Sequence, residues 1–357
     1  MRSWQRNATL ALSIFASVGT VSAEGVKEPR IVSGSFASIE STPWQVFLDI
    51  GNSQTGYFAC GGIIISDQYV LTAAHCIEGF SAADVRVFAG FEQLSYAGSG
   101  ISVSKVIAYP DYDNERFTGD IALVKLSGKL PTNTQPIKLL LPARQSELDQ
   151  EFENAALDNL YVSGWGATFT GGKINAALLK TTMNGVSDNQ CYWTNDNNGV
   201  GPVNSELSNA YICADKSYTA GVCSGDSGGP LVWQDKNHAG DADLGYRAVG
   251  IVSFSSSKFG CGSVNSEDAF TQISSYHDWI NLNMDGGYSE PSPTFSVDIF
   301  DPAYNYNPDA DNPIKPVYPS DADSILPTPS SGGGGSIGWL SFVFVGMVAA
   351  RRRVSYS

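Results

Sequence analysis

Histidine and basic residues are scarce in this chain. It has three histidines among 357 residues, His75, His238 and His277, so a histidine-rich metal site is not expected. Its 21 basic residues face 36 acidic ones, and a net charge of −15 makes nucleic-acid backbone an unsuitable partner. Hydrophobic residues are not scarce, because they make up 42% of the chain, and aromatic residues make up 11%. The composition therefore excludes a wholly disordered protein and predicts a large packed core.

Residues 1–23 have the pattern of a secretory signal peptide. Arg2 and Arg6 precede the largely apolar residues 8–21, and the small residue Ala23 suits cleavage by signal peptidase. A buried helix and an N-terminal membrane anchor are the alternatives. We predict an exported protein, so the six cysteines would lie in an oxidising compartment, where an even number suits a disulfide framework.

Residues 285–330 differ sharply in composition from the rest of the chain. They contain nine of the 17 prolines, eight acidic residues and a single lysine, Lys315. Such a segment cannot bury enough apolar surface to offset its loss of chain entropy. We therefore predict an extended, disordered acidic stalk, in which Tyr304, Tyr306 and Tyr318 leave local docking open.

The last part of the chain combines three short features. Residues 331–336 are a Ser-Gly-Gly-Gly-Gly-Ser joint, residues 337–350 are apolar, and three arginines begin the basic tail of residues 351–357. The apolar run is shorter than the roughly 17–25 residues of a full membrane span, and the arginines indicate a cytoplasmic end. This order of parts resembles the bacterial GlyGly-CTERM sorting signal.

The resemblance to that signal implies a route of maturation. In that family a rhomboid-type protease, rhombosortase, cuts near the glycines, and substrates often leave by type II secretion. The expected partners are signal peptidase, the rhomboid-type sorting protease and the secretion machinery. The resemblance implies transient anchoring in the inner membrane of a Gram-negative bacterium, followed by an extracellular or cell-surface location. A simple tail anchor is the alternative.

The body between residues 31 and 284 reads as all-β. Short apolar runs rich in β-branched and aromatic residues are separated by Gly, Ser, Asn and Asp, which is typical of strands and turns. Clear helical periodicity occurs mainly at Ser274–Asn283. The predicted strands include residues 44–50, 62–65, 85–89, 121–126, 160–162 and 248–254.

Three short motifs stand in order along this body. One surrounds His75 (Leu-Thr-Ala-Ala-His-Cys), one begins at Asp120 (Asp-Ile-Ala-Leu-Val-Lys-Leu), and one surrounds Ser227 (Gly-Asp-Ser-Gly-Gly-Pro). Together they resemble the motifs of the trypsin/chymotrypsin family of serine proteases, over nearly all of residues 31–284. The resemblance implies two six-stranded antiparallel β-barrels with a C-terminal helix.

The chemistry explains why these residue types occur together. A serine hydroxyl is a weak nucleophile at neutral pH and needs a base. The resemblance implies that His75 takes the proton of Ser227 and later protonates the leaving amine, while Asp120 orients and stabilises His75. The backbone N–H groups of Gly225 and Ser227 would form the oxyanion hole. We predict a monomeric serine endopeptidase that acts on proteins and peptides without a cofactor or metal; a non-catalytic binding or adhesin module is the alternative.

The start of the body resembles an activation site. Residues 24–30 form a short propeptide, and the following Ile-Val-Ser-Gly is similar to the first residues of mature family members. The resemblance implies a zymogen that is cut after Arg30, whereupon the new α-amino group of Ile31 inserts beside Asp226. A buried carboxylate without such a partner would be costly.

The resemblance also implies how the cysteines pair, which the sequence alone leaves open. The family pattern pairs Cys60 with Cys76, Cys191 with Cys213, and Cys223 with Cys261. The last bond would tie the loop of the serine to the wall of the substrate pocket.

The substrate pocket departs from the trypsin pattern. Trypsins have an aspartate six residues before the nucleophile, where this chain has Gly221, and Asp268 takes a place that is usually a pocket glycine. This exchange resembles some crustacean collagenolytic proteases of broad specificity. A desolvated carboxylate attracts Arg and Lys, so we predict either residue at P1, just before the scissile bond, with broad tolerance. Masking by Lys258, or a shifted register, would instead give an elastase-like or chymotrypsin-like pocket. The other predicted pocket residues are Val222, Ser253, Phe254 and Ser255.

Overall fold

The computed structural model describes residues 34–195, 202–216, 219–306 and 314–316. These residues belong to one compact unit, and the second unit, Asp321–Ser357, contains none of them. The predicted signal peptide, propeptide, joint, apolar run and basic tail all lie outside the described residues. Within the described ranges, no helix has the length and apolar character needed to cross a membrane.

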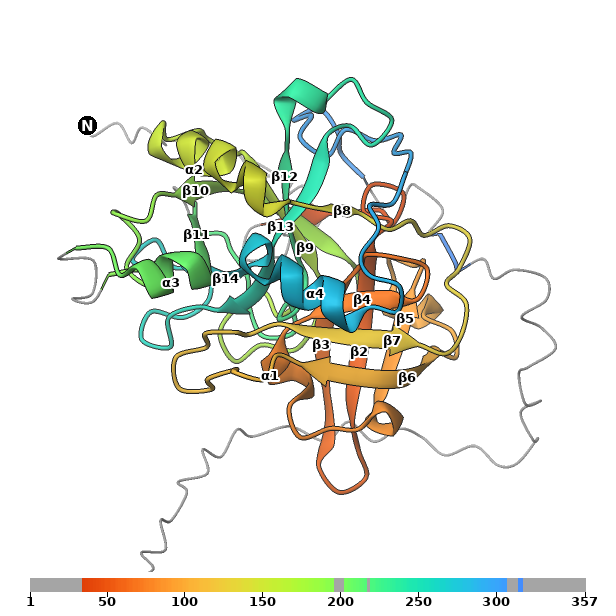
Figure 1. Cartoon of the computed structure of the whole chain (residues 1–357). Helices are drawn as coiled ribbons and strands as arrows, with labels where there is room; N and C mark the ends of the chain where they lie inside the picture. The colour runs from red at the N-terminus through yellow and green to blue at the C-terminus, as the bar shows by residue number, and fades with distance from the viewer. Residues whose placement is uncertain (1–33, 196–201, 217–218, 307–313, 317–357) are drawn as a thin grey trace, which may run out of the picture. The chain divides into compact units, whose positions relative to one another are not determined.

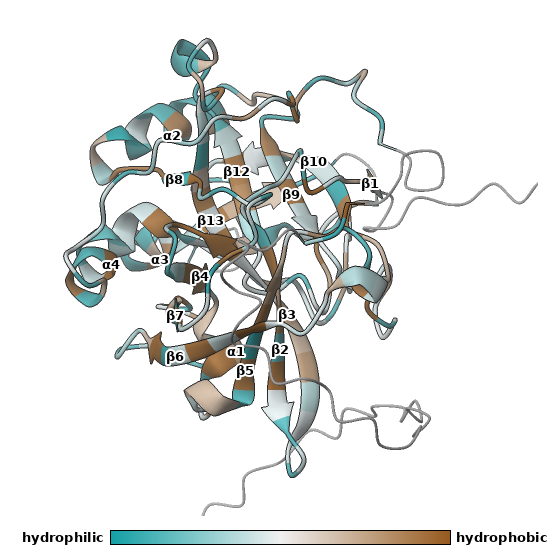
Figure 2. Cartoon of the chain, turned by 90° about the vertical axis from the view of Figure 1, so that its right-hand side faces the viewer, coloured by the Kyte–Doolittle hydropathy of each residue, from teal (hydrophilic) through white to brown (hydrophobic). Residues whose placement is uncertain are grey.

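The first half of the body is a closed antiparallel barrel of six strands (Figure 1). Alternate residues of β2, such as Val46, Leu48 and Ile50, are fully buried, as the period-two pattern of a strand requires. Figure 2 shows hydrophobic residues along the strands of this barrel. In ring order the strands are β2 (Gln45–Asn52), β3 (Gly56–Ile64), β4 (Tyr69–Thr72), β7 (Ala122–Leu126), β6 (Ile101–Ala108) and β5 (Val85–Ala89).

The second half is also a six-stranded antiparallel barrel, closed where β12 pairs with β9. Two short strands are added to it: β1 (Ser35–Phe36) pairs with β10, and β8 (Lys138–Leu139) lies parallel to β13. The two predicted barrels are therefore confirmed. In ring order the strands are β9 (Leu160–Gly164), β10 (Leu179–Val186), β11 (Tyr211–Asp215), β14 (Asp268–Gln272), β13 (Tyr246–Phe254) and β12 (Pro230–Gln234).

Helices are short and lie outside the barrels. The predicted helix near residue 280 is confirmed as a 3-10 turn followed by α4. A helix that the sequence did not suggest to us, α2, buries Leu148 and Phe152 on one face, and Gly185 leaves the space that the Phe152 ring fills. The α-helices are α1 (Ala74–Ile77), α2 (Gln145–Glu153), α3 (Ser205–Ala210) and α4 (His277–Asn283), and the 3-10 turns are Ala82–Asp84, Leu94–Tyr96, Pro142–Arg144, Lys236–His238 and Ile273–Tyr276.

The chain after α4 does not form the extended stalk that we expected from residue 285. Residues 285–306, here called the C-terminal strap, lie on the body as the blue segment that follows α4 (Figure 1). Phe295 is 6% exposed, and its ring centre lies 4.8 Å from that of Trp44 and 5.8 Å from that of Tyr246. The stalk prediction is wrong for these residues, because their aromatic side chains find apolar partners on the folded barrels.

Hydrogen bonds fix the strap along its length. The side-chain amide of Gln135 donates to Thr294 O at 2.8 Å and accepts from Thr294 N at 2.9 Å. Further along, Ile299 N donates to Tyr246 Oη at 3.0 Å, and Tyr304 Oη lies 2.8 Å from Ser38 Oγ. The strap is therefore part of the folded domain, and the rest of the predicted stalk lies outside the described residues except for residues 314–316.

Candidate active site

The turn that carries Ser227 contacts the first barrel at the seam between the two barrels. Gly61 N, on β3 of the first barrel, donates to Ser227 O of the second at 2.7 Å. A Cβ on Gly61 would lie 2.8 Å from the Cα of Gly229, so only glycine permits this approach. Beside it, Ser163 Oγ donates to Gln45 Oε1 at 2.8 Å.

His75 is held from one side by a buried carboxylate. Asp120 is fully buried, and its Oδ2 lies 2.8 Å from His75 Nδ1, while its Oδ1 accepts from His75 N at 2.8 Å. Ser253 Oγ donates to the same Oδ2 at 2.5 Å. A negative charge at Nδ1 fixes the ring so that Nε2 is left to accept a proton.

Ser227 projects from a sharp turn between Cys223 and β12. Glycines at 225 and 228 adopt φ angles of 99° and 83°, which side-chain-bearing residues rarely adopt. His75 Nε2 lies 3.7 Å from Cys76 Sγ, which in turn lies 3.8 Å from Ser227 O, so the imidazole and the serine turn are neighbours. In the described chain no hydrogen bond of 3.5 Å or less joins Ser227 Oγ to His75 Nε2; such bonds often tighten only when substrate binds.

The serine turn also presents two unused backbone donors. The residues just before and after Ser227 use their amides within the protein: Asp226 N donates to Cys223 O at 2.9 Å, and Gly228 N donates to Val252 O at 2.8 Å. Those of Gly225 and Ser227 donate to no other residue among those that the structure describes. Two free N–H groups beside a hydroxyl are suited to binding a negatively charged oxygen.

Asp226 is 1% exposed, and the described residues that hold its carboxylate do so through backbone amides. Its carboxylate accepts from Gly166 N at 2.8 Å and from Cys223 N at 3.0 Å. A Cβ on Gly164 or Gly166 would lie 2.1 or 2.3 Å from its oxygens. No ion pair reaches Asp226 within the described ranges, and burial raises its pKa to about 7.

The carboxylate of Asp268 lies beside Gly221 and Val222. Its Oδ2 accepts from Val222 N at 3.0 Å and would lie 2.3 Å from a Cβ on Gly221. The side chain is 4% exposed, and burial, reinforced by nearby acidic groups, raises its pKa to about 7. Lys258 does not mask it, because its Nζ lies over the ring of Phe259 at 4.8 Å.

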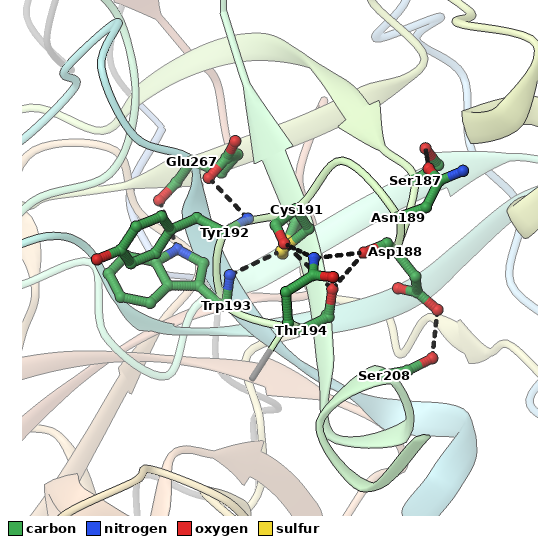
Figure 3. The surroundings of a disulfide bond; sticks show 11 residues. Ser187, Asp188, Asn189, Cys191, Tyr192, Trp193, Thr194, Ser208 and Glu267 are labelled. Carbon is green, nitrogen blue, oxygen red and sulfur yellow. Dashed lines mark hydrogen bonds between the residues drawn. A yellow bond between two sulfur atoms is a disulfide. The ribbon is translucent and has the colours of Figure 1, made fainter. Parts of the chain in front are cut away.

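An aromatic group borders His75, and of its members only Phe254 was predicted as a site residue from the sequence. The Phe117 ring centre lies 5.9 Å from that of His75 and 5.2 Å from that of Phe254, and Phe117 adopts a φ of 58°. Trp193 packs on Phe254, with 5.0 Å between ring centres, and its Nε1 donates to Glu267 O at 2.9 Å. Figure 3 shows Trp193 and Glu267 beside Cys191. The sequence does not predict the contacts of Phe117 and Trp193, because these residues come together with Phe254 only in the folded barrel.

The three predicted disulfides are confirmed: Cys60–Cys76, Cys191–Cys213 and Cys223–Cys261. Cys60 and Cys76, together with His75, are the one group among the described residues with metal-ligand spacing. Both sulfurs are bonded to each other and are not thiolates, so this group is a poor metal site. Two predicted activation residues, Arg30 and Ile31, lie outside the described residues.

Two closed barrels with these residues at their seam define a chymotrypsin-like fold. The chain belongs to the trypsin family, because a family model described as Trypsin matches residues 31–280. A solved structure described as HL collagenase is 27% identical in sequence, with a TM-score of 0.55 over 71% of this chain and 98% of that one. The protein is accordingly a trypsin-like serine endopeptidase with protein substrates.

Proposed function

We propose that Ser227, His75 and Asp120 carry out the peptidase chemistry through an acyl-enzyme. The observation that carries this assignment is the buried carboxylate of Asp120 bonded to both N and Nδ1 of His75. His75 Nε2 takes the Ser227 proton as Oγ attacks the carbonyl carbon, and then gives it to the leaving amine. Water repeats the sequence in reverse and frees the serine.

The N–H groups of Gly225 and Ser227 would bind the oxyanion of the tetrahedral intermediates. Because no other described residue accepts from them, an oxyanion would not have to displace a bond to another described group. Loss of one such donor typically costs on the order of 10²–10³ in rate.

The enzyme is made as a zymogen in this proposal. Asp226 is buried and lacks a cation in the described residues, which supports a role as receiver of the Ile31 ammonium after cleavage at Arg30. The ion pair would lower the pKa of Asp226 and hold the turn that carries the Gly225 and Ser227 donors.

Arg or Lys at P1, with broad tolerance, is the proposed specificity. The support is the buried carboxylate of Asp268 beside Gly221, without a positive partner in the described chain. A substrate guanidinium or ammonium would supply that partner. An elastase-like or chymotrypsin-like preference would follow if Asp268 stays protonated during catalysis.

Export is proposed from the two ends of the sequence together with the disulfides. A cleavable signal, three disulfides and the glycine–apolar–arginine tail support passage through the inner membrane and release at the cell surface or beyond.

Covalent labelling tests the catalytic assignment most directly. The enzyme activated from the full-length chain would be treated with an organophosphonate and the labelled peptide sequenced, with Ser227→Ala as the matched blank. We expect label on Ser227 and none in the variant. An unlabelled, fully folded wild-type protein would favour the non-catalytic binding module.

Turnover of matched peptides with Arg, Lys, Phe, Leu and Ala at P1 then tests whether Asp268 selects the P1 side chain. An Asp268→Gly enzyme that keeps its Arg preference would refute that role of Asp268.

A further inference from the structure

The segment that follows the predicted activation site is attached to the second barrel by a very short strand. β1 is two residues long and pairs with one end of β10 (Figure 2). Just after it, Ala37 N donates to Leu178 O at 3.0 Å. So short a strand at the end of the folded body is the kind of element that opens locally at low cost. Any group that holds it also fixes the point from which the chain runs back to Ile31.

Tyr304, near the end of the C-terminal strap, holds this segment from outside. Its Oη lies 2.8 Å from Ser38 Oγ, two residues after β1. Lys180 is 8% exposed and belongs to the part of β10 that pairs with β1. Its Nζ lies 4.4 Å from the centre of the Tyr304 ring and donates to Tyr304 O at 3.4 Å, so the ring and the carbonyl stabilise a largely buried cation. One strap residue therefore contacts both the N-terminal segment and the strand on which that segment lies.

Two further contacts from the C-terminal side reach the next two residues. Ser296 Oγ donates to Glu40 Oε1 at 3.3 Å. Glu92 is 1% exposed, and its carboxylate accepts from Ile39 N at 3.1 Å and from Ile314 N at 2.9 Å, so one buried side chain binds both segments. The contacts of the C-terminal side thus converge on residues 38–40, where the N-terminal segment enters the folded body.

We propose that Tyr304 is a positioning residue for activation: by holding residues 35–38, it keeps the new amino terminus at Ile31 within short reach of Asp226. This inference rests on the proposed zymogen mechanism and adds a role for the strap to it. The predicted sorting cleavage at residues 331–336 lies beyond Tyr304, so the released enzyme would retain this contact.

The size of the effect follows from the length of the tether. A tethered group acts at an effective concentration that falls roughly as the −3/2 power of the tether length. With β1 in place, the first fixed residue is Ser35, four residues after Ile31. If residues 35–38 came loose, the first fixed residue would be Ile39, eight residues after Ile31, because Glu92 still holds its amide. Doubling the tether lowers the effective concentration of the amino group at Asp226 about threefold.

The reactivity of the Ile31 amino group measures this effect directly. The enzyme activated from the full-length chain is treated with cyanate at fixed pH, and mass spectrometry follows the initial rate of carbamylation at Ile31. An amino group inserted beside Asp226 is shielded from the reagent, so the rate is proportional to the withdrawn fraction. The ε-amino group of Lys236, which is exposed, serves as the reference in the same sample.

We expect Tyr304→Ala to raise the rate at Ile31 about threefold relative to Lys236. Tyr288→Ala is the matched control, because Tyr288 is another half-buried tyrosine of the strap, and its hydroxyl accepts from Leu139 N on β8 at 3.0 Å. This control should lose a similar amount of stability and leave the rate at Ile31 unchanged. Denaturant unfolding of both variants shows that each is folded and compares their stabilities.

An unchanged rate at Ile31 in Tyr304→Ala, or an equal increase in Tyr288→Ala, would overturn the role of Tyr304. Failure of the zymogen mechanism has a different signature in the unaltered enzyme. There, full activity with Ile31 as reactive as a free Ile-Val peptide, or with no free amino group at Ile31, would defeat the mechanism itself.

Discussion

The seam between the barrels and the C-terminal strap are built from opposite kinds of sequence. The seam uses short motifs in which each residue type is required by chemistry or by backbone geometry, such as the glycine at position 225 with its φ of 99°. The strap is acidic and proline-rich, with isolated aromatic residues, and resembles a linker in composition. Both nevertheless end as buried, hydrogen-bonded parts of one domain. The difference teaches that a motif can be interpreted in isolation, whereas the docking of a sparse segment depends on the surface that it meets.

The largest expected effect at the seam is the loss of enzyme activity in the Arg30→Gln variant, which cannot be cleaved after residue 30. Without a free Ile31 amino group, Asp226 would keep its raised pKa and the Gly225 and Ser227 donors would not be held in place. We expect the variant to be about 10²–10³-fold less active than the processed enzyme. Activity per folded molecule is measured on the full-length chain after exposure to an activating protease.

Lys27→Gln, in the same predicted propeptide, is the matched control and should activate normally. Full activity in Arg30→Gln would show that the seam is organised without the cleavage, and the zymogen proposal would be abandoned.

Phe295→Ala tests the strap with a smaller effect. The ring is 6% exposed and lies between Trp44 and Tyr246, so its removal leaves a cavity that the surrounding barrels cannot easily close. We expect the free energy of unfolding to fall by about 3 kcal/mol, with the activity per folded molecule unchanged. Denaturant unfolding of the full chain measures the first quantity and an active-site titration the second.

Leu282→Ala is the control for that change, because Leu282 is 81% exposed on α4 and its loss should alter stability by at most about 0.5 kcal/mol. If the two variants had the same stability, the strap would be a loosely attached segment, as its composition suggested.

The sequence predicted the seam well and the strap poorly for a physical reason. His75, Asp120 and Ser227 stand in three motifs that resemble those of the family. Gly221 could be placed by its distance from Ser227, and Asp268 by alignment of the family pattern on Phe270. Phe117 could not be predicted, because its role depends on contact with His75 and Phe254 across the fold.

The strap was misjudged because composition averages over a segment. Aromatic residues are six of the 46 in residues 285–330 but five of the 22 in the strap, about twice their share of the whole chain. These rings dock: Phe295 packs on Trp44, the ring centre of Phe300 lies 6.0 Å from that of Tyr246, and Tyr288 Oη accepts from Leu139 N at 3.0 Å. A few well-placed rings can outweigh many exposed polar residues, since full burial of one large apolar side chain contributes roughly 1.5–3 kcal/mol.

The smallest expected effect is the pH dependence of the P1 preference, which reports the charge of Asp268 and not the other residues of the seam. A carboxyl whose pKa is raised to about 7 is neutral below that pH and negative above it. The preference for Arg over Leu at P1 should therefore rise with pH, by about tenfold between pH 6 and 8, as the ionised fraction goes from about a tenth to nine tenths.

The measurement is the ratio of kcat/KM for two peptides that differ only at P1. A group whose protonation changes the cleavage of both peptides alike cancels in the ratio. Asp268→Asn keeps the shape of the side chain and should make the ratio low and independent of pH. A wild-type ratio that stays constant over this range would mean that the charge of Asp268 does not change between pH 6 and 8. The effect of burial and of Asp226, Asp215 and Glu267 on its pKa would then be offset by other groups.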